Sequence, residues 1–376
     1  MRGGLDLWCL TAAVLALAGL VFPLGGETGL SWLDAPGAGA FALGFVGLCV
    51  WLARGQGGPL RGLILVGAVV LGAGVALYLL YGAGMAGGAR HGFWLFVLAL
   101  WAAAWRGIDE IAAVRSLDKR VQRTVDLAVP FAFGCWLVFL WEAATVGFGV
   151  PQVLLPAPSQ IAARFAGSLD ILFADFHQTF VKAVISGYVI GCGSGFLVSI
   201  LVDRVPFLRR GLLPLGNLVS ALPIVGIAPI MVMWFGFDWQ SKAAVVVVMT
   251  FFPMLVNTVS GLAASGALER DLMQSYGAGY WATLVKLRLP AAMPFIFNAL
   301  KINSTLALIG AIVAEFFGTP IVGMGFRIST EVGRMNVDMV WAEIVLAALA
   351  GSAFYGAMAL SERAVTFWHP SYRQRR

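Results

Sequence analysis

The side chains that could do chemistry in this sequence are acids and amides set within long apolar stretches. Glu142 and Glu315 each lie near one end of such a stretch, and Asn217, Asn257 and Asn303 lie inside others. Polar groups are costly in a bilayer, so where they occur they line a substrate or ion pathway or bond to a neighbouring helix. The pattern therefore predicts a transport pathway. The alternatives are glutamates placed at the membrane interface and asparagines that only join helices.

A proline-rich apolar stretch, residues 212–235, is a second candidate for part of a pathway. Its prolines are Pro214, Pro223 and Pro229. Prolines bend a helix and free carbonyl groups, and a bilayer tolerates freed carbonyls only against protein or a water-filled path. Trp234 and Phe316 lie near one membrane surface, where aromatic side chains either gate a path or form an interfacial belt.

A third pattern lies in residues 264–294, where a more polar segment interrupts the apolar sequence. Ala267–Tyr276 is predicted to be a helix that ends at Gly277. One face of this helix carries Leu268, Leu272 and Tyr276, at i, i+4 and i+8. Tyr280–Leu289 is predicted to be a second, amphipathic helix, which Pro290 ends because proline blocks helix continuation.

The sequence contains no motif for catalytic, metal-binding or nucleotide-binding chemistry. The three histidines are scattered, and the four cysteines fall in apolar stretches without metal or disulfide spacing. There is no GxxxxGK[ST] phosphate-binding loop, so the chain is predicted not to be an enzyme, to bind no metal or cofactor and to hydrolyse no ATP by itself.

The elements that position these residues are membrane helices. Of the 376 residues 60% are hydrophobic and 12% are charged, whereas about a quarter of an ordinary soluble domain is charged. Runs of about twenty apolar residues span a bilayer as helices. We predict an all-α polytopic membrane protein with about ten spans: 7–24, 38–52, 63–81, 93–105, 127–146, 179–201, 212–235, 243–262, 295–316 and 339–360.

The basic residues predict the orientation of these spans. With the N-terminus inside, most of the 25 lysines and arginines fall in inside loops, as the positive-inside rule requires. Both termini and the 264–294 loop are therefore predicted to face the cytoplasm. This asymmetry accounts for the net charge of +6 without a nucleic-acid partner.

A basic, less apolar stretch divides the chain into regions. We predict an accessory four-helix membrane region at 1–105, a cytoplasmic linker at 106–126 and a functional core at 127–376. The first region carries few polar residues within its spans, which argues against a second transport path there.

The 264–294 loop resembles the cytoplasmic "EAA" coupling loop of bacterial ABC-importer permeases. That loop reads Glu-Ala-Ala, three residues, Gly, nine residues and then Ile-x-Leu-Pro. Here Asp271-Leu272-Met273 is followed at the same spacings by Gly277 and by Leu287-Arg288-Leu289-Pro290. The first triplet departs from the pattern, because Asp replaces Glu and two bulkier residues replace Ala.

Other stretches resemble permeases of the nitrate, sulfonate and taurine type. They are "LWEAATVGFGVPQVLLPAPSQIAARF" (140–165), "LPIVGIAPIMVMWFGFDWQSK" (222–242), "FFPMLVNTVSGL" (251–262) and "WHPSYR" (368–373). The resemblance covers about residues 128–373. It implies a type I (MetI-like) permease core preceded by four extra helices, in the plasma membrane (the bacterial inner membrane).

The resemblance also implies the partners and the roles of residues. A cytoplasmic ABC ATPase, which binds ATP with Mg²⁺, would receive the coupling loop in a groove; an extracytoplasmic binding protein would deliver the solute, and a second copy of the chain would complete a homodimer. The coupling residues would be Asp271, Gly277, Lys286, Leu289 and Pro290. The pathway candidates remain Glu142, Asn217, Pro223, Trp234, Asn257, Asn303, Glu315 and Phe316.

The implied solute is small and organic. It is either a pyrimidine or riboflavin-type vitamin precursor, which the 228–237 and 251–262 stretches favour, or an anion of the sulfonate, taurine or nitrate type. Two other functions stay open at this point. An ion-coupled secondary transporter would need inverted repeats and acids near span centres, and a membrane scaffold would need no patterned loop.

Overall fold

The computed structural model describes residues 5–25, 29–55, 57–116, 118–220, 222–318 and 321–368, without the side chains of residues 217, 218 and 220. The chain divides into two compact units, Met1–Ile161 and Ala162–Arg376, which we call unit 1 and unit 2. The described residues are helical, apart from turns and isolated bridges such as the one between Gly25 and Leu30. An all-α fold is therefore confirmed.

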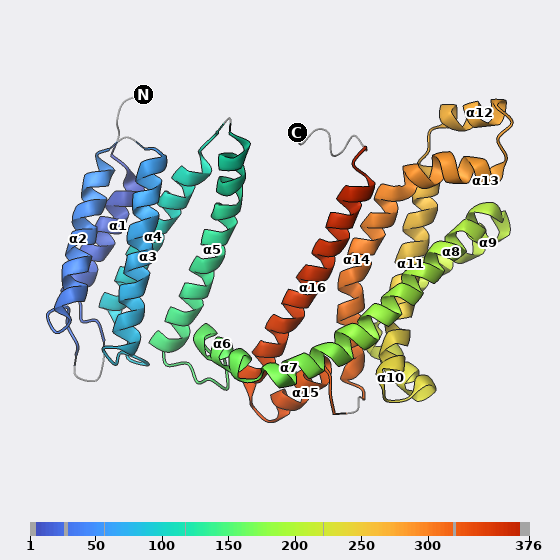
Figure 1. Cartoon of the computed structure of the whole chain (residues 1–376). Helices are drawn as coiled ribbons and strands as arrows, with labels where there is room; N and C mark the ends of the chain where they lie inside the picture. The colour runs from blue at the N-terminus through green and yellow to red at the C-terminus, as the bar shows by residue number, and fades with distance from the viewer. Residues whose placement is uncertain are drawn as a thin grey trace. The chain divides into compact units, whose positions relative to one another are not determined.

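Unit 1 is built from long helices that run side by side (Figure 1). They are α1 (Leu7–Val21), α2 (Pro36–Ala53), α3 (Pro59–Tyr81), α4 (His91–Ala112) and α5 (Lys119–Gly147), and the first residues of α6 (Pro158–Gly167) follow. The predicted linker at 106–126 thus lies mostly within the end of α4 and the start of α5. Because α5 packs with the preceding helices, unit 1 extends beyond the four-helix region predicted at 1–105.

A buried charge cluster joins three segments of unit 1. The carboxylate of Asp6, which precedes α1, accepts hydrogen bonds from Arg61 of α3 and from Arg106 of α4. Glu110 of α4 lies 3.1 Å from the guanidinium of Arg106 and 3.4 Å from that of Arg61. Sequence reasoning missed this cluster because its members lie far apart in the chain.

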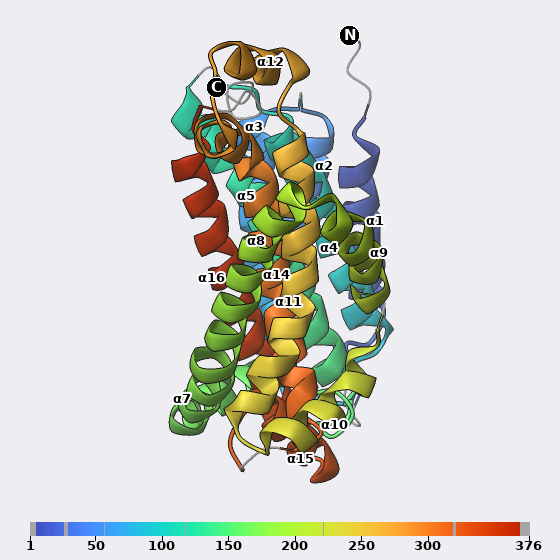
Figure 2. The same cartoon turned by 90° about the vertical axis from the view of Figure 1, so that its right-hand side faces the viewer.

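Unit 2 begins with one long helical run, α7 (Leu169–Phe176), η1 (His177–Val184) and α8 (Ile185–Arg204), in which η1 is a π-helix. The helices that follow are α9 (Pro206–Ser220), α10 (Ile224–Phe235), α11 (Trp239–Ala263), α12 (Ala267–Ser275), α13 (Tyr280–Thr283), η2 (Leu284–Arg288), α14 (Leu289–Glu315), α15 (Met324–Gly333) and α16 (Val337–Val365). Helices α12 and α13 lie at one end of the unit, which we call the loop end, and α15 lies at the other, which we call the α15 end (Figures 1 and 2).

Helix α11 is the centre of unit 2, with α8 on one side and α14 on another (Figure 2). Gly187, Gly191 and Gly195 of α8 face it, one turn apart. A Cβ atom at Gly187 would lie 2.6 Å from the Ala243 carbonyl oxygen, and one at Gly195 would lie 2.5 Å from that of Phe251. Small residues at this spacing let two membrane helices approach closely, so α8 and α11 pack as one body.

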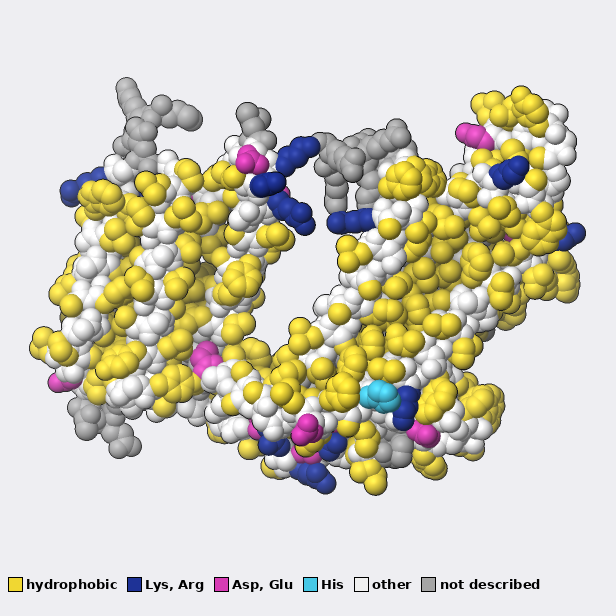
Figure 3. Space-filling model, viewed as in Figure 1, with side chains coloured by type: hydrophobic (Ala, Val, Ile, Leu, Met, Phe, Trp, Pro, Cys, Tyr) yellow, Lys and Arg dark blue, Asp and Glu magenta, His cyan; other side chains and the backbone are white. Residues whose placement is uncertain are grey.

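The membrane class predicted from the sequence is confirmed. Within the described residues, seven helices are long and apolar enough to cross a bilayer, and α1 and α10 are shorter apolar helices. In Figure 3 hydrophobic side chains cover the flanks of each unit, while charged side chains gather mainly at the ends. One predicted span is wrong: residues 212–235 do not form a single helix, because α9 stops at Ser220 and α10 starts at Ile224.

Candidate functional site

The 264–294 loop folds as the predicted helix–turn–helix. Helix α12 ends in a turn where the amide of Ala278 donates to the Met273 carbonyl at 3.0 Å. Gly277, at the centre of this turn, has φ +66° with nothing within 4 Å of the position where a Cβ would lie. A positive φ is readily adopted by glycine and tolerated by asparagine, but it strains most other residues.

The first helix of this loop presents apolar side chains to solvent. Leu268 is 83% exposed, Leu272 57% and Tyr276 82%, and α12 has no buried residue. The predicted candidates Asp271 and Lys286 are also exposed. Exposed apolar side chains grouped on a polar segment mark a surface that binds a partner, and a helix of this kind docks in an apolar groove.

The second helix of the loop does not end where predicted. Helical structure continues through Leu289 and Pro290 into α14, with the π-helix η2 at the junction. The amide of Leu289 bonds to the Leu284 carbonyl five residues earlier, and Pro290, which has no N–H, lies in the first turn of α14, where none is required. The chain bends at this junction between α13 and α14 (Figure 1).

An ion pair fixes this bend to the end of α8. The guanidinium of Arg288 donates to both carboxylate oxygens of Asp203, with both nitrogen–oxygen distances 2.7 Å. Its third donor, Nε, bonds to the carbonyl of Leu262 near the end of α11 at 3.0 Å. Sequence reasoning missed this pair, because its residues are 85 positions apart and Arg288 occupies the variable position of the coupling-loop motif.

The gap between α9 and α10 opens a cavity in unit 2. It has a volume of about 340 Å³ and is lined by Val219, Leu222, Pro223, Ile224, Ile227, Val245, Val248, Met249, Pro253 and Leu306. None of these side chains is charged. Non-helical backbone at membrane depth is tolerated where it lines a cavity, and ligand sites are concave, mostly apolar and of about this size or larger.

Of the predicted pathway residues, Pro223 lines this cavity and Asn257 lies next to it. The side-chain amide of Asn257 donates to the carbonyl of Pro253, a lining residue, at 2.8 Å. The side chain of Asn217 lies outside the described residues. Asn303 is fully buried and donates to the Thr250 carbonyl at 2.8 Å, so it joins α14 to α11.

Glu315 lies in a buried network at the α15 end of unit 2. Its carboxylate accepts a hydrogen bond from the Thr179 hydroxyl at 2.8 Å and one from the Gly325 amide at 2.7 Å. Asp175 accepts from the Gly323 amide at 2.6 Å and from Arg327 at 2.8 Å. These bonds hold α15 against α7 and η1, and they leave Glu315 only 2% exposed.

A second polar group stands beside this network, at the start of α11. Asp238 accepts hydrogen bonds from Gln178 and from the amide of Trp239, both at 2.8 Å. Burial raises the pKa of Asp238, but these hydrogen bonds and the nearby Lys182 and Lys242 hold that pKa below its ordinary value. The carboxylate therefore caps α11 in its charged form.

The remaining pathway candidates are spread over both units. Glu142 belongs to unit 1, where its carboxylate accepts hydrogen bonds from Tyr81 of α3 and from the hydroxyl and amide of Ser159. In unit 2, Trp234 is 70% exposed on α10, and Phe316 is 45% exposed just after α14. Of the candidates whose side chains the structure describes, Pro223 lines the cavity between α9 and α10.

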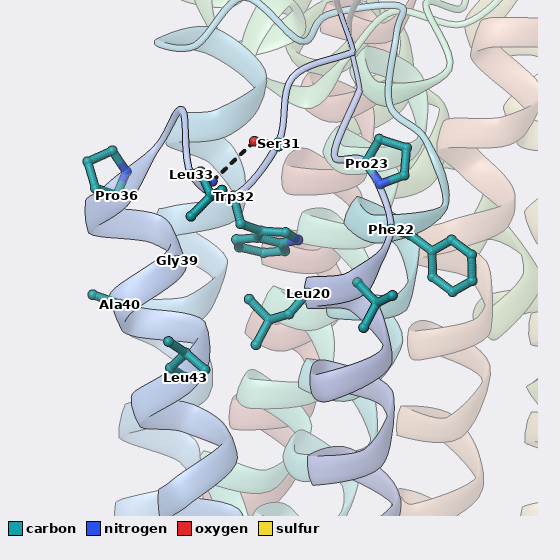
Figure 4. A pocket seen from close by; sticks show the side chains of 11 residues that line it. Leu20, Phe22, Pro23, Ser31, Trp32, Leu33, Pro36, Gly39, Ala40 and Leu43 are labelled. Carbon is teal, nitrogen blue, oxygen red and sulfur yellow. Dashed lines mark hydrogen bonds between the residues drawn. The ribbon is translucent and has the colours of Figure 1, made fainter.

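Unit 1 contains another cavity, of about 770 Å³, between the end of α1 and the start of α2 (Figure 4). Leu20, Trp32 and Leu43 are among its lining residues, and the indole of Trp32 donates to the Gly19 carbonyl at 2.8 Å. No charged side chain lines it. Its described lining is apolar apart from Ser31.

Long apolar helices, a solvent-facing helix–turn–helix and a broken helix beside a cavity together define a membrane transport subunit. Comparison with known proteins identifies the class. Residues 187–367 match the family described as "Binding-protein-dependent transport system inner membrane component". The chain belongs to this family and is the permease subunit of an ATP-driven ABC importer in the inner membrane.

The chain aligns with several relatives over most of their length. The chain is 31% identical to the formylaminopyrimidine transport permease protein of Halalkalibacterium halodurans over 66% of this chain and 98% of that protein. It is 30% identical to the riboflavin transport system permease protein of Chloroflexus aurantiacus, over 65% and 91%. It is 25% identical to the taurine transport system permease protein of Escherichia coli, over 62% and 86%.

Proposed function

We propose that two copies of this chain form the membrane pathway of an importer for a small aromatic heterocycle. A separate cytoplasmic ATPase, which binds ATP with Mg²⁺, docks on the 264–294 loop, and an extracytoplasmic protein delivers the solute. The chain itself catalyses no reaction. The exposed apolar stripe Leu268, Leu272 and Tyr276 on a loop spaced as in ABC permeases carries the proposal.

The docking surface combines this stripe with a charged border. Asp271 and Lys286 are exposed on either side of the turn at Gly277, while Leu289 and Pro290 are half-buried at the start of α14. An apolar stripe binds in a groove, and the charges at its border orient the two partners. The apolar stripe and its charged border therefore contact the ATPase, and Leu289 and Pro290 connect the loop to the membrane helices.

The orientation follows from the distribution of basic residues. Arg270, Lys286 and Arg288 lie in or beside the 264–294 loop, and Arg204 with Arg209 lies beside the turn between α8 and α9. Loops rich in lysine and arginine remain in the cytoplasm. The loop end of unit 2 and both termini therefore face the cytoplasm, and the α15 end faces outward.

The 340 Å³ cavity supports a heterocycle rather than a fixed anion. Its lining includes the apolar side chains Met249, Val248 and Ile227, and it includes no arginine, lysine or histidine. An unpaired anion in such surroundings would lose its hydration without compensation, whereas a flat uncharged ring gains from burial. Two relatives are named for formylaminopyrimidine and riboflavin, which both contain such rings.

Exposed apolar side chains on α10 support a second copy of the chain. Met233 is 82% exposed, Trp234 70% and Phe235 53%, next to the cavity-lining start of the same helix. A two-fold dimer uses the same surface on both subunits. Pairing through α10 would place both cavities near the symmetry axis, where one path can serve both subunits.

The test uses the turn at Gly277. The chain is reconstituted in liposomes with its ATPase and binding protein, and solute-stimulated ATP hydrolysis is measured for the wild type, Gly277→Asp and Gly277→Asn. Asparagine has the shape of aspartate and tolerates a positive φ, so Gly277→Asn should remain close to the wild type. Gly277→Asp adds a charge at the docking surface and should lose stimulation.

The same liposomes identify the solute. Riboflavin and formylaminopyrimidine are compared with taurine as stimulating ligands. Stimulation by a heterocycle alone supports the proposal, and stimulation by taurine alone overturns the substrate class. If Gly277→Asp behaves as the wild type, the turn at Gly277 is not part of the docking surface, and the proposed docking on this loop fails.

A further inference from the structure

The carboxylate of Asp203 is the point where both ends of the second loop helix meet the membrane helices. Besides the two bonds from Arg288, Asp203 accepts a hydrogen bond from the Tyr280 hydroxyl at 3.0 Å. Tyr280 begins α13 and Arg288 ends η2. A bidentate pair between an arginine and a carboxylate has a fixed geometry as well as a fixed distance, so the whole segment between these two residues is held to the end of α8.

Neighbouring contacts make this junction stiff. The guanidinium of Arg204 lies 5.4 Å from the ring centre of Tyr280 and 5.8 Å from that of Trp281. Leu284 is 1% exposed and belongs to the same apolar core as Leu262 of α11. The side chain of Asp203 is itself only 5% exposed. A displacement of the loop therefore moves the ends of α8 and α11 rather than bending the loop alone.

The helix that carries Asp203 reaches the opposite end of unit 2 without a break. Leu169–Arg204 is one helical run of 36 residues, and Asp175 lies about 40 Å from Asp203 along it, at 1.5 Å per residue. Asp175 binds Arg327 and the Gly323 amide there. The run therefore has an aspartate–arginine pair at each end, one to the loop and one to α15.

Close packing prevents the run from slipping along its neighbour. A Cβ atom at Gly191 would lie 2.1 Å from the Thr250 hydroxyl oxygen of α11, and Gly187 and Gly195 leave equally little room. The π-helix η1 lies between α8 and the network of Asp175 and Glu315. Such wide turns inside α-helices often occur at functional sites, and η1 gives the run one point where it can change direction.

We propose that Asp203 and Arg288 are positioning residues that transmit movement of the 264–294 loop along α8 and η1 to the network that holds α15. The inference rests on the proposed docking of the ATPase on this loop. Neither residue lines the 340 Å³ cavity. Closure of the ATPase would displace α13, and the paired side chains would convert this displacement into movement of the run and so into a change at the far end of unit 2.

The experiment measures solute transported per ATP hydrolysed, in liposomes that contain the full chain, its ATPase and its binding protein. The variants are Asp203→Asn, Arg288→Gln and the combination of both, together with the exchange of Asp203→Arg and Arg288→Asp. Arg164→Gln is the matched control, because Arg164 lies outside the 169–204 run and forms a looser pair with Asp338, at 3.7 Å. Co-purification of the ATPase is measured for every variant.

We expect each single variant to bind the ATPase as the wild type does while transport per ATP falls about ten-fold, within the usual range of coupling between sites. The combined variant should be no worse than either single one, as for residues that act as a pair. The exchanged pair should recover part of the loss, and Arg164→Gln should lose none. A merely structural role would lower the amount of folded complex and leave this ratio unchanged.

Other outcomes overturn the proposal. If Arg288→Gln keeps the wild-type ratio while Gly277→Asp loses stimulation, the loop docks the ATPase but the pair transmits nothing. If Arg288→Gln and Arg288→Lys both fail to bind the ATPase, Arg288 belongs to the docking surface instead. If Gly277→Asp also behaves as the wild type, the docking proposal itself fails.

Discussion

The side-chain amide of Asn303 donates to the backbone carbonyl of Thr250 at 2.8 Å, and this bond joins α14 to α11 inside unit 2. Asn303 is fully buried and does not line the cavity between α9 and α10. An intramembrane asparagine in such a position stabilises the packing of helices. This position favours a role in joining the two helices, and its predicted place in the pathway stays a prediction.

Replacing Asn303 with alanine should lower stability without changing the apparent affinity for the solute. The lost hydrogen bond should cost about 1 kcal/mol in unfolding free energy, the usual range for interhelical bonds in membranes. Thermal unfolding in detergent and the KM for transport measure the two effects. Asn298→Ala is the control, because Asn298 lies on the same helix and is exposed. A changed KM at unchanged stability would place Asn303 in the pathway after all.

Helix α15 should not tolerate a side chain at Gly325. A Cβ there would lie 2.1 Å from the carbonyl oxygen of Ile312 and 2.9 Å from Cβ of Glu315. Because both atoms belong to α14, against which α15 packs, Gly325→Ala should destabilise the protein by about 3 kcal/mol or more, measured as a lower unfolding temperature. Gly333→Ala, in the same helix with nothing within 4 Å, should be neutral. Equal behaviour of the two variants would show that α15 can move away from α14 at little cost.

The cavity between α9 and α10 should be blocked by a large side chain at Val248. Val248→Trp fills part of the 340 Å³ space, and transport should fall about ten-fold or more while the ATPase still binds. Overpacking costs about 1–3 kcal/mol, so stability is measured in parallel. Val189→Trp, at a position 63% exposed on α8, should transport normally. Normal transport by Val248→Trp would mean that the path runs elsewhere.

The sequence predicted those features that depend on local pattern. The apolar runs predicted the membrane class. The i, i+4, i+8 spacing predicted that Leu268, Leu272 and Tyr276 share one face of a helix, and in the structure this face of α12 is exposed. Glycine at 277 predicted the turn, which has a positive φ. Each of these signals lies within about twenty residues of sequence, where hydropathy, helix periodicity and backbone sterics act.

Features that depend on contacts between residues far apart in the chain could not be predicted from the sequence. Asp203 and Arg288 meet across 85 positions, and nothing local distinguishes them from other charges near helix ends. The end predicted at Pro290 was wrong because the π-helix η2 leads directly into α14 and Pro290 falls in the first turn of α14, where no N–H is required. Glu142 and Glu315 were predicted as pathway residues only because burying a carboxylate in a bilayer is costly. In the structure, hydrogen bonds within each unit offset that cost for each glutamate separately.

The carboxylate of Glu142 supports one last prediction, on the link between α3 and α5 in unit 1. Tyr81→Phe removes one of the hydrogen bonds to Glu142, which is only 7% exposed. A hydrogen bond to a charged group contributes about 1.5–3 kcal/mol, so the unfolding temperature should fall clearly. Tyr78→Phe, on the same helix with a side chain 63% exposed, should leave it unchanged. If Tyr81→Phe instead keeps the stability and abolishes transport, Glu142 acts in transport and not only in the packing of α3 against α5.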